Sequence, residues 1–211
     1  MKEPIDRREL EEKMAREGRL PPGQSLTIKF PVLHYGSVPQ FDPATWRFRI
    51  WGEVEDEVTW TWEDFNQLPQ SEVQLDIHCV TKWSKFDTKW KGIALASLVD
   101  QGLLKIKPTA AFVLQHAQGG YTTNLPLEMV LQDNFLLATH FNDEPLAPEH
   151  GYPVRGMIGH FPERPNLKTA YFWKGAKWLT GLEFLTEDQM GFWEKAGYHN
   201  EGDVWKEQRR R

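Results

Sequence analysis

The chain has 211 residues, a formal net charge of −5 at pH 7, 40% hydrophobic residues and 26% charged residues. This length suits one large domain or two small ones with a substantial core. The acidic balance argues against a general nucleic-acid binder, which carries a basic excess. No stretch approaches the roughly 18 apolar residues of a membrane span, so we expect no membrane partner.

The compartment is indicated by cysteine usage and by the first residues. Cys79 is the only cysteine, so no intrachain disulfide can form and nothing implies an oxidising compartment. The chain begins with charged residues, and no hydrophobic region follows the pair Arg7-Arg8 as an export signal would require. We therefore expect a cytoplasmic protein.

The predicted elements divide the chain into two parts. Residues 1–23 form a charged N-terminal arm or a marginal amphipathic helix, which ends at the turn Pro21-Pro22-Gly23, and residues 24–211 form the domain. Hydrophobic patterns predict strands at 26–30, 46–54, 73–77, 111–116, 135–141, 154–158 and 178–184. Helices are expected after the N-cap Thr61, over 93–100, over 127–132 and over 186–196, with a loop between Cys79 and Gly92. Because strands outnumber helices without regular alternation, the class is α+β.

Cys79 is the first candidate for chemistry. It follows a run with apolar residues at alternate positions and precedes a segment that contains Lys82, Lys85, Lys89 and Lys91. Cationic neighbours favour the thiolate, the form that binds a metal or attacks an electrophile. The alternative is a small buried hydrophobic residue, since free cysteine is among the most buried types. A nucleophilic dyad with His78 is disfavoured, because neighbours along a strand point to opposite faces.

Histidines offer a second candidate site. His140, His150 and His160 recur at intervals of ten, which fits neither a helical face nor a hairpin register. A metal site made of these three residues remains open, but separate, hydrogen-bonded loop histidines are the favoured interpretation.

Two cationic segments lie far from Cys79 in the sequence. The first runs over residues 150–155 and contains Arg155, and the second runs over residues 171–178 and contains Lys174 and Lys177. In each, a glycine lets the backbone approach a ligand closely, and a long cation can reach a phosphate or another oxyanion. Surface loops would show similar residues, but together with a candidate thiolate the two segments indicate a pocket for an anionic cofactor.

Here the sequence resembles a known family. The molybdopterin-binding domain of the sulfite oxidase family, and especially its short, soluble bacterial members, is similar to this chain over roughly residues 30–205. The residues that carry the resemblance are 33–36 (LHYG), 76–84 (DIHCVTKWS), 90–93 (WKGI), 121–127 (YTTNLPL), 150–155 (HGYPVR), 173–178 (WKGAKW) and 197–203 (GYHNEGD). The resemblance implies a mixed-sheet, sulfite oxidase-type fold and a molybdenum-molybdopterin cofactor.

The resemblance also implies roles for single residues. Cys79 falls where the family's cysteine ligates molybdenum, and soft thiolate suits a metal already held by the sulfurs of the pterin. The positions that match cofactor contacts of the family are His34, Tyr35, His116, His150, Arg155, Gly175, Ala176 and Lys177, with Lys177 as phosphate partner. Backbone N–H groups beside a lysine make a competent phosphate cradle.

The implied reaction is oxygen-atom transfer to or from a small oxyanion, an S-oxide or an N-oxide, with an unidentified electron-transfer partner. Lys82, His160 and Arg164 are candidates for steering the substrate. The sequence departs from animal and plant sulfite oxidases, because Val80-Thr81-Lys82-Trp83 stands where they have an arginine-rich run. A sulfoxide reductase, a cofactor carrier without turnover and a metal-free protein with a structural cysteine are the alternatives.

Overall fold

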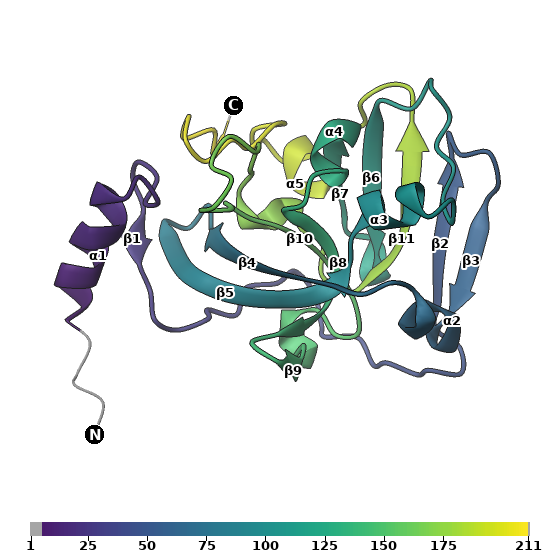
Figure 1. Cartoon of the computed structure of the whole chain (residues 1–211), viewed down its shortest axis with the longest axis horizontal. Coiled ribbons are helices and arrows are strands. Elements are labelled where there is room, and N and C mark those ends of the chain that lie inside the picture. The colour runs from purple at the N-terminus through teal and green to yellow at the C-terminus, as the bar shows by residue number, and fades with distance from the viewer. Residues whose placement is uncertain (1–5, 211) are drawn as a thin grey trace.

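The computed structural model describes residues 6–210, and their strands form two β-sheets (Figure 1). The strands are β1 (Ser25–Leu26), β2 (Arg47–Gly52), β3 (Val58–Thr61), β4 (Ser71–His78), β5 (Trp83–Ile93), β6 (Phe112–Ala117), β7 (Thr122–Pro126), β8 (Phe135–Phe141), β9 (Glu144–Pro145), β10 (Arg155–Ile158) and β11 (Leu179–Leu185). Short helices connect them: α1 (Arg7–Arg16), α2 (Trp62–Gln67), α3 (Leu95–Asp100), α4 (Leu127–Val130) and α5 (Phe192–Lys195). Three 3₁₀ turns are η1 (Gln118–Gly120), η2 (Pro148–His150) and η3 (Phe172–Lys174).

Both sheets mix strand directions. The first has the order β1-β5-β8-β10, with β4 paired to β5 and β9 to β8, and only β1 and β5 run parallel. The second has the order β3-β2-β11-β6-β7, with β2 and β11 parallel. This arrangement confirms the expected α+β class with mixed sheets.

The first sheet separates two hydrophobic clusters. Phe135 and Leu137 of β8 belong to the larger cluster, which also takes side chains from the second sheet. Leu136 and Ala138 belong to the smaller cluster, which includes Cys79. Successive side chains of a strand point to opposite faces, so β8 contributes alternately to the two clusters. Cys79 thus lies on the face of the first sheet that is turned away from the main core.

Several local patterns behave as the sequence indicates. The strand β2 alternates exposed Arg47 and Arg49 with buried Phe48 and Ile50. The helix α2 begins at a capping box, in which Thr61 accepts a hydrogen bond from the Asp64 amide and the Asp64 side chain accepts one from the Thr61 amide. Reciprocal bonds of this kind satisfy two of the N–H groups that a helix start leaves unpaired.

The prediction of a loop between Cys79 and Gly92 is wrong. Residues 83–93 form the long strand β5, which pairs with β4 along one edge and with β8 along the other. This strand lacks an alternating hydrophobic pattern, because some of its buried positions hold polar residues. Two of these, Ser84 and Thr88, are hydrogen-bonded inside the sheet. The predicted helix over 186–196 is also too long, since α5 covers only Phe192–Lys195 and its N-cap is Gly191.

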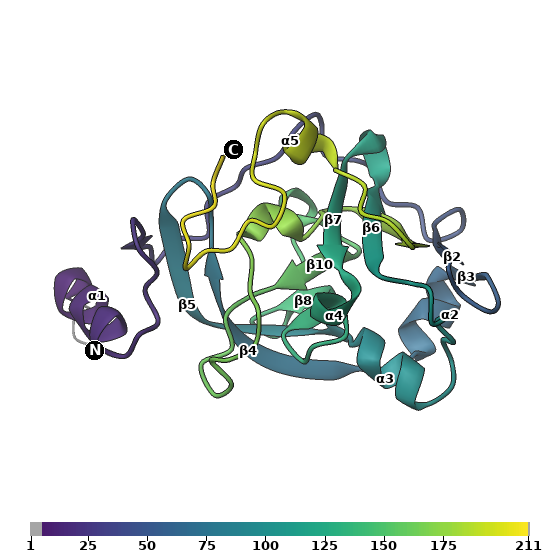
Figure 2. The same cartoon turned by 90° about the horizontal axis from the view of Figure 1, so that it is seen from above.

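The N-terminal arm contacts the domain. Its residues 1–5 lie outside the described part of the chain, and α1 lies at one end of the molecule near β5, opposite α2 and α3 (Figure 2). Met14 of α1 is buried, and Arg19 forms an ion pair with Asp76 of β4. The division into 1–23 and 24–211 stays a prediction. Within residues 6–210, no helix combines the length and the apolar character that crossing a membrane requires.

Candidate active site

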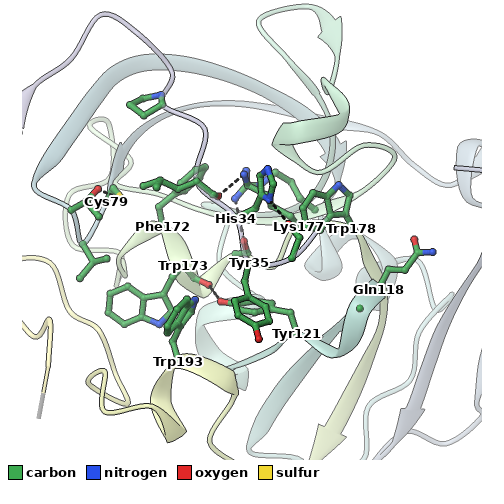
Figure 3. Close-up of a pocket in the computed structure, with 18 of the residues that line it drawn as sticks. His34, Tyr35, Cys79, Gln118, Tyr121, Phe172, Trp173, Lys177, Trp178 and Trp193 are labelled. Atoms are coloured by element: carbon green, nitrogen blue, oxygen red, sulfur yellow. Dashed lines mark hydrogen bonds between the residues drawn. The ribbon is translucent and has the colours of Figure 1, made fainter. Parts of the chain in front are cut away.

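A cavity of about 670 Å³ opens beside Cys79 (Figure 3). Its walls come from parts of the chain that are distant in sequence, within residues 31–39, 79–83, 118–121, 172–178 and 193–198, together with Arg155. Six of the predicted site residues line it: His34, Tyr35, Cys79, Arg155, Gly175 and Lys177. The fold therefore brings the thiol and both predicted phosphate-binding cations to one cavity.

The turn between β4 and β5 presents the Cys79 thiol. The Cys79 amide donates to the Trp83 carbonyl at 2.8 Å, and the Lys82 amide donates to the Cys79 carbonyl at 3.0 Å. The Thr81 hydroxyl donates to the Cys79 sulfur at 3.2 Å. Burial raises the pKa of this thiol, and the hydrogen bond from Thr81 and the charge of Lys177 oppose that rise.

The lysines that follow Cys79 in sequence do not explain its chemistry. Lys82, Lys85, Lys89 and Lys91 do not line the cavity, and Lys89 instead pairs with Glu72 and Asp143. These cations therefore do not account for a thiolate, whereas a metal bound to the sulfur would itself keep the thiol deprotonated. His78 is turned to the other side, where its Nδ1 lies 2.8 Å from the Ser84 hydroxyl. The dyad with His78 is not formed.

Arg155, the first residue of β10, is a buried cation. Its guanidinium donates to the carbonyls of His150 at 3.0 Å, Gly175 at 3.1 Å and Gly156 at 3.3 Å. It lies 4.1 Å from the centre of the Phe172 ring, and the residue is only 1% exposed. Burial lowers the pKa of Arg155 to about 9.

Lys177 is the second cation at the cavity. Its ammonium donates to the carbonyls of Leu33 at 2.8 Å and Glu149 at 2.7 Å. Burial, and then the charge of Arg155, lower the pKa of Lys177 to about 7. No carboxylate of residues 6–210 forms an ion pair with Arg155 or Lys177, so the cavity has a local excess of positive charge that an anionic ligand would neutralise.

The loop that carries Lys177 is fixed by a residue that the sequence does not point to. The buried amide of Gln115 donates to the Lys174 carbonyl at 2.6 Å and accepts from the Ala176 amide at 3.0 Å. Gly156 leaves room for it, because a Cβ there would lie 2.0 Å from the Gln115 oxygen. Lys174 itself points inward and pairs with buried Glu194 at 2.8 Å, so only Lys177 of this loop's two lysines reaches the cavity.

Comparison with known proteins identifies the family. The model of the family "Oxidoreductase molybdopterin binding domain" matches residues 35–193. The chain is 43% identical to an "Uncharacterized oxidoreductase YuiH" from Bacillus subtilis, over 92% of this chain and 93% of that protein. The chain belongs to the molybdopterin oxidoreductases of the sulfite oxidase family.

More distant members of the family are larger than this chain. Rat mitochondrial sulfite oxidase is 24% identical over 84% of this chain and 37% of its own length. The catalytic subunit MsrP of a protein-methionine-sulfoxide reductase from Campylobacter jejuni is 26% identical over 73% of this chain and 54% of its own length. The sulfane dehydrogenase SoxCD of Paracoccus pantotrophus has the same fold, with a TM-score of 0.60 and 20% identity over 73% of this chain and 41% of that chain.

The cavity fits the cofactor of this family. Besides the thiol and the two cations, its wall includes Trp83, whose indole N–H is buried and has no hydrogen-bond partner among residues 6–210. Buried donors without a partner are uncommon and indicate a ligand acceptor or water. The described residues contain no group of three or more His, Cys, Asp or Glu that could hold a metal by themselves. A molybdenum ion bound beside Cys79 would therefore take further ligands from the pterin.

Three of the positions predicted from the family resemblance do not line this cavity. The imidazole of His116 lies 2.9 Å from the Glu183 carboxylate in the second sheet. The ring of His150 stacks on Phe30 with centroids 3.8 Å apart, and it contributes its carbonyl to Arg155. Ala176 is fully buried behind Gly175 and contributes its amide to Gln115. His150 and Ala176 therefore support residues that line the cavity without lining it themselves.

The predicted steering residues also lie elsewhere. Lys82 is exposed and has a left-handed backbone with φ 71°. His160 is buried behind β4, where it exchanges backbone hydrogen bonds with Asp76. Arg164 pairs with Asp133 in a loop. None of the three is among the residues that line the cavity.

An aromatic wall completes the cavity, and of its residues only Tyr35 is predicted from the sequence as part of the site. Figure 3 shows Trp173 and Trp193 gathered beside Tyr35 and Tyr121. The Tyr198 ring links the two tryptophans, with centroids 5.2 Å from each. The sequence signal was the total of ten tryptophans, which does not distinguish core from cavity.

Proposed function

We propose that this chain catalyses oxygen-atom transfer to or from a small oxyanion, S-oxide or N-oxide at a molybdenum-molybdopterin cofactor bound in the cavity. The observation that carries the proposal is the convergence of Cys79, Arg155 and Lys177 on one cavity, although 98 residues separate Cys79 from Lys177. The family membership supports it.

Each of these residues would have a separate task. Cys79 would ligate the molybdenum, and the bound cofactor would supply two-electron oxygen-atom chemistry. Lys177 and Arg155 would hold the phosphate and the pterin, and the indole N–H of Trp83 would donate to a cofactor acceptor. The Cys79 residue is buried, with only 7% exposure, at the wall of the cavity.

The cavity wall favours a substrate that carries no net charge. Besides His34, the charged or titratable nitrogen groups that line it are Arg155 and Lys177, both assigned to the cofactor, whereas the remaining wall consists of aromatic, aliphatic and uncharged polar residues and the Cys79 thiol. A sulfite dianion would need further cations for its desolvation. We therefore favour an S-oxide, whose reduction to a sulfide takes up two electrons and two protons and releases water. Such a reaction requires an electron donor, so an electron-transfer partner belongs to the proposal.

Metal analysis tests the central claim. The protein is produced with molybdate, and its molybdenum and the fluorescence of the released pterin are measured per chain. We expect about one of each per chain in the wild type. Protein with neither molybdenum nor pterin would contradict the proposal.

Cys79→Ser separates the ligand from a structural cysteine. We expect the variant to lose activity and to retain the pterin, because Arg155 and Lys177 still bind the phosphate. Unfolding of the variant would instead favour a structural thiol. Turnover is then measured with sulfite, sulfoxides and N-oxides, and a loaded protein that turns over none of them would be a carrier.

A cytoplasmic location is part of the proposal. Its support is the single, unpaired cysteine. Cell fractionation with a tagged chain tests it, and recovery from an exported fraction would contradict it.

A further inference from the structure

The turn that carries Cys79 is held by residues outside the segment that the family model matches, residues 35–193. The amide of Gln24 donates to the Cys79 carbonyl at 3.0 Å. The guanidinium of Arg209 donates to the Val80 carbonyl at 2.7 Å. Two successive carbonyls of the turn are thus each held by a side chain from a different end of the domain.

Arg209 also joins the two segments to each other. Its second terminal nitrogen donates to the carbonyls of Gly23 at 3.3 Å and Pro22 at 3.4 Å. Its guanidinium carbon lies 4.8 Å from the centre of the Tyr171 ring, and its side chain is only 16% exposed. A planar guanidinium can bond several carbonyls and stack on a ring at the same time, so this side chain links residues 22–23, the Cys79 turn and the loop that begins at Tyr171.

The turn needs such support because its own backbone is strained. Lys82 adopts φ 71°, a region that residues other than glycine rarely occupy and that persists only where the surroundings enforce it. On the other side of Lys82, the Ser25 amide donates to the Lys82 carbonyl at 3.0 Å. Three contacts from residues 24, 25 and 209 therefore fix a four-residue turn that would otherwise relax.

We propose that Gln24 and Arg209 are positioning residues, which hold the Cys79 turn closed and fix the direction of the thiol at the cavity. The importance of this positioning for catalysis rests on the proposed role of Cys79 as a metal ligand. The experiment below does not depend on that role. A ligand whose backbone is held in place needs less ordering when the metal binds.

The test uses the full chain without cofactor, produced in a host that cannot synthesise molybdopterin. Because Cys79 is the only cysteine, the rate of alkylation by iodoacetamide reports on this thiol alone. We expect Arg209→Ala to raise this rate about tenfold, as the loss of one charge-assisted hydrogen bond predicts. Gln24→Met keeps the side-chain volume and removes the other contact, so it should also raise the alkylation rate. This second variant provides the test if Arg209→Ala folds poorly.

Arg49→Ala is the matched control. The Arg49 guanidinium also lies over an aromatic ring, at 4.9 Å from the centre of Trp51, but it pairs with Glu57 on the second sheet and does not contact the turn. We expect no change in its alkylation rate. Arg209→Lys, which can donate to Val80 alone, should restore part of the wild-type protection.

A further measurement separates positioning from general stability. In low urea the faster alkylation of Arg209→Ala should not depend on urea concentration, because a local opening exposes little surface, whereas global unfolding would give a steep dependence. An unchanged rate in both variants, or a steep urea dependence, would overturn the inference. Absence of molybdenum from protein made in a competent host would contradict the proposed function and leave this result standing.

Discussion

The guanidinium of Arg155 is buried against the face of Phe172, with its central carbon 4.1 Å from the ring centre, and not against a carboxylate. Three carbonyls take its hydrogen bonds, and burial lowers its pKa to about 9. A cation with neutral partners keeps most of its charge available to a ligand. A guanidinium held by carbonyls can therefore bind an anionic ligand, whereas one already paired with a carboxylate would have much of its charge neutralised.

The first prediction concerns the shape of this cation. Arg155→Lys keeps a positive charge but loses the planar fork and the stacking on Phe172. We expect about a tenfold lower cofactor content per chain, which corresponds to roughly 1.4 kcal/mol of lost binding free energy. Molybdenum and released pterin are measured in parallel. A variant with full cofactor content would show that charge alone suffices.

The second prediction is a pH-dependent stability. The pKa of Lys177 is about 7 in the folded protein and about 10.4 in an unfolded chain. Between these values the unfolded chain holds a proton that the folded protein lacks, so the wild type gains stability as the pH rises from 7 towards 10. Lys177→Met removes the buried charge, and in the cofactor-free protein it should be more stable than the wild type by about 1–3 kcal/mol at pH 7 and below. The difference should vanish near pH 10.

Urea unfolding at pH 6, 8 and 9.5 measures this difference. Lys89→Met is the control, because the Lys89 side chain is partly exposed and its ammonium donates hydrogen bonds to Asp143 and Glu72, which raise its pKa. That variant should gain no stability at low pH. A difference between Lys177→Met and the wild type that does not change with pH would contradict the assignment of the shift to burial.

Much of the fold follows from local patterns. The alternation around Phe48 and the capping box at Thr61 are properties of consecutive residues, so the sequence alone indicates β2 and the start of α2. The strand β5 is different. Its buried Ser84 and Thr88 are stabilised by hydrogen bonds to His78 and Leu75 of a neighbouring strand, and no pattern within β5 shows those partners.

The candidate site divides in the same way. Cys79, Arg155 and Lys177 stand out as residue types in motifs, and the cavity unites them. The sequence draws attention to His116 and not to its neighbour Gln115. Adjacent residues of a strand face opposite sides, and of these two only Gln115 points to the loop that carries Lys177. Lys174 and Lys177 look equivalent in the sequence. Their difference comes from Glu194, which lies 20 residues after Lys174 and draws it into the interior.

The third prediction follows from Gln115. Gln115→Leu keeps the volume but leaves the Lys174 carbonyl and the Ala176 amide without their partner. Since a buried unpaired polar group costs about 1–3 kcal/mol, we expect a loss of about 2–4 kcal/mol in the free energy of unfolding. Cofactor content should fall as well, because the loop that carries Lys177 loses its anchor.

Gln118→Leu is the control for this variant. Gln118 is exposed at the cavity in η1, and its substitution should change stability by no more than about 0.5 kcal/mol. Urea unfolding of both variants decides the matter. Equal stability of the two proteins would show that the Gln115 amide does not fix the loop.

The fourth prediction concerns the contact between the arm and β4. Arg19 donates to both carboxylate oxygens of Asp76, at 2.8 and 2.6 Å, and the Asp76 side chain is 0% exposed. Arg19→Ala leaves a buried carboxylate without its cation, so we expect a loss of about 3–5 kcal/mol in the free energy of unfolding. Arg8→Ala breaks an exposed pair with Glu12 and should cost at most about 1 kcal/mol. Urea unfolding at neutral pH compares the two. Breaking a buried ion pair should lower the free energy of unfolding more than breaking an exposed one, because the remaining charge stays away from water. If Arg19→Ala lowers it no more than Arg8→Ala does, the pair between Arg19 and Asp76 does not stabilise the contact between the arm and the domain.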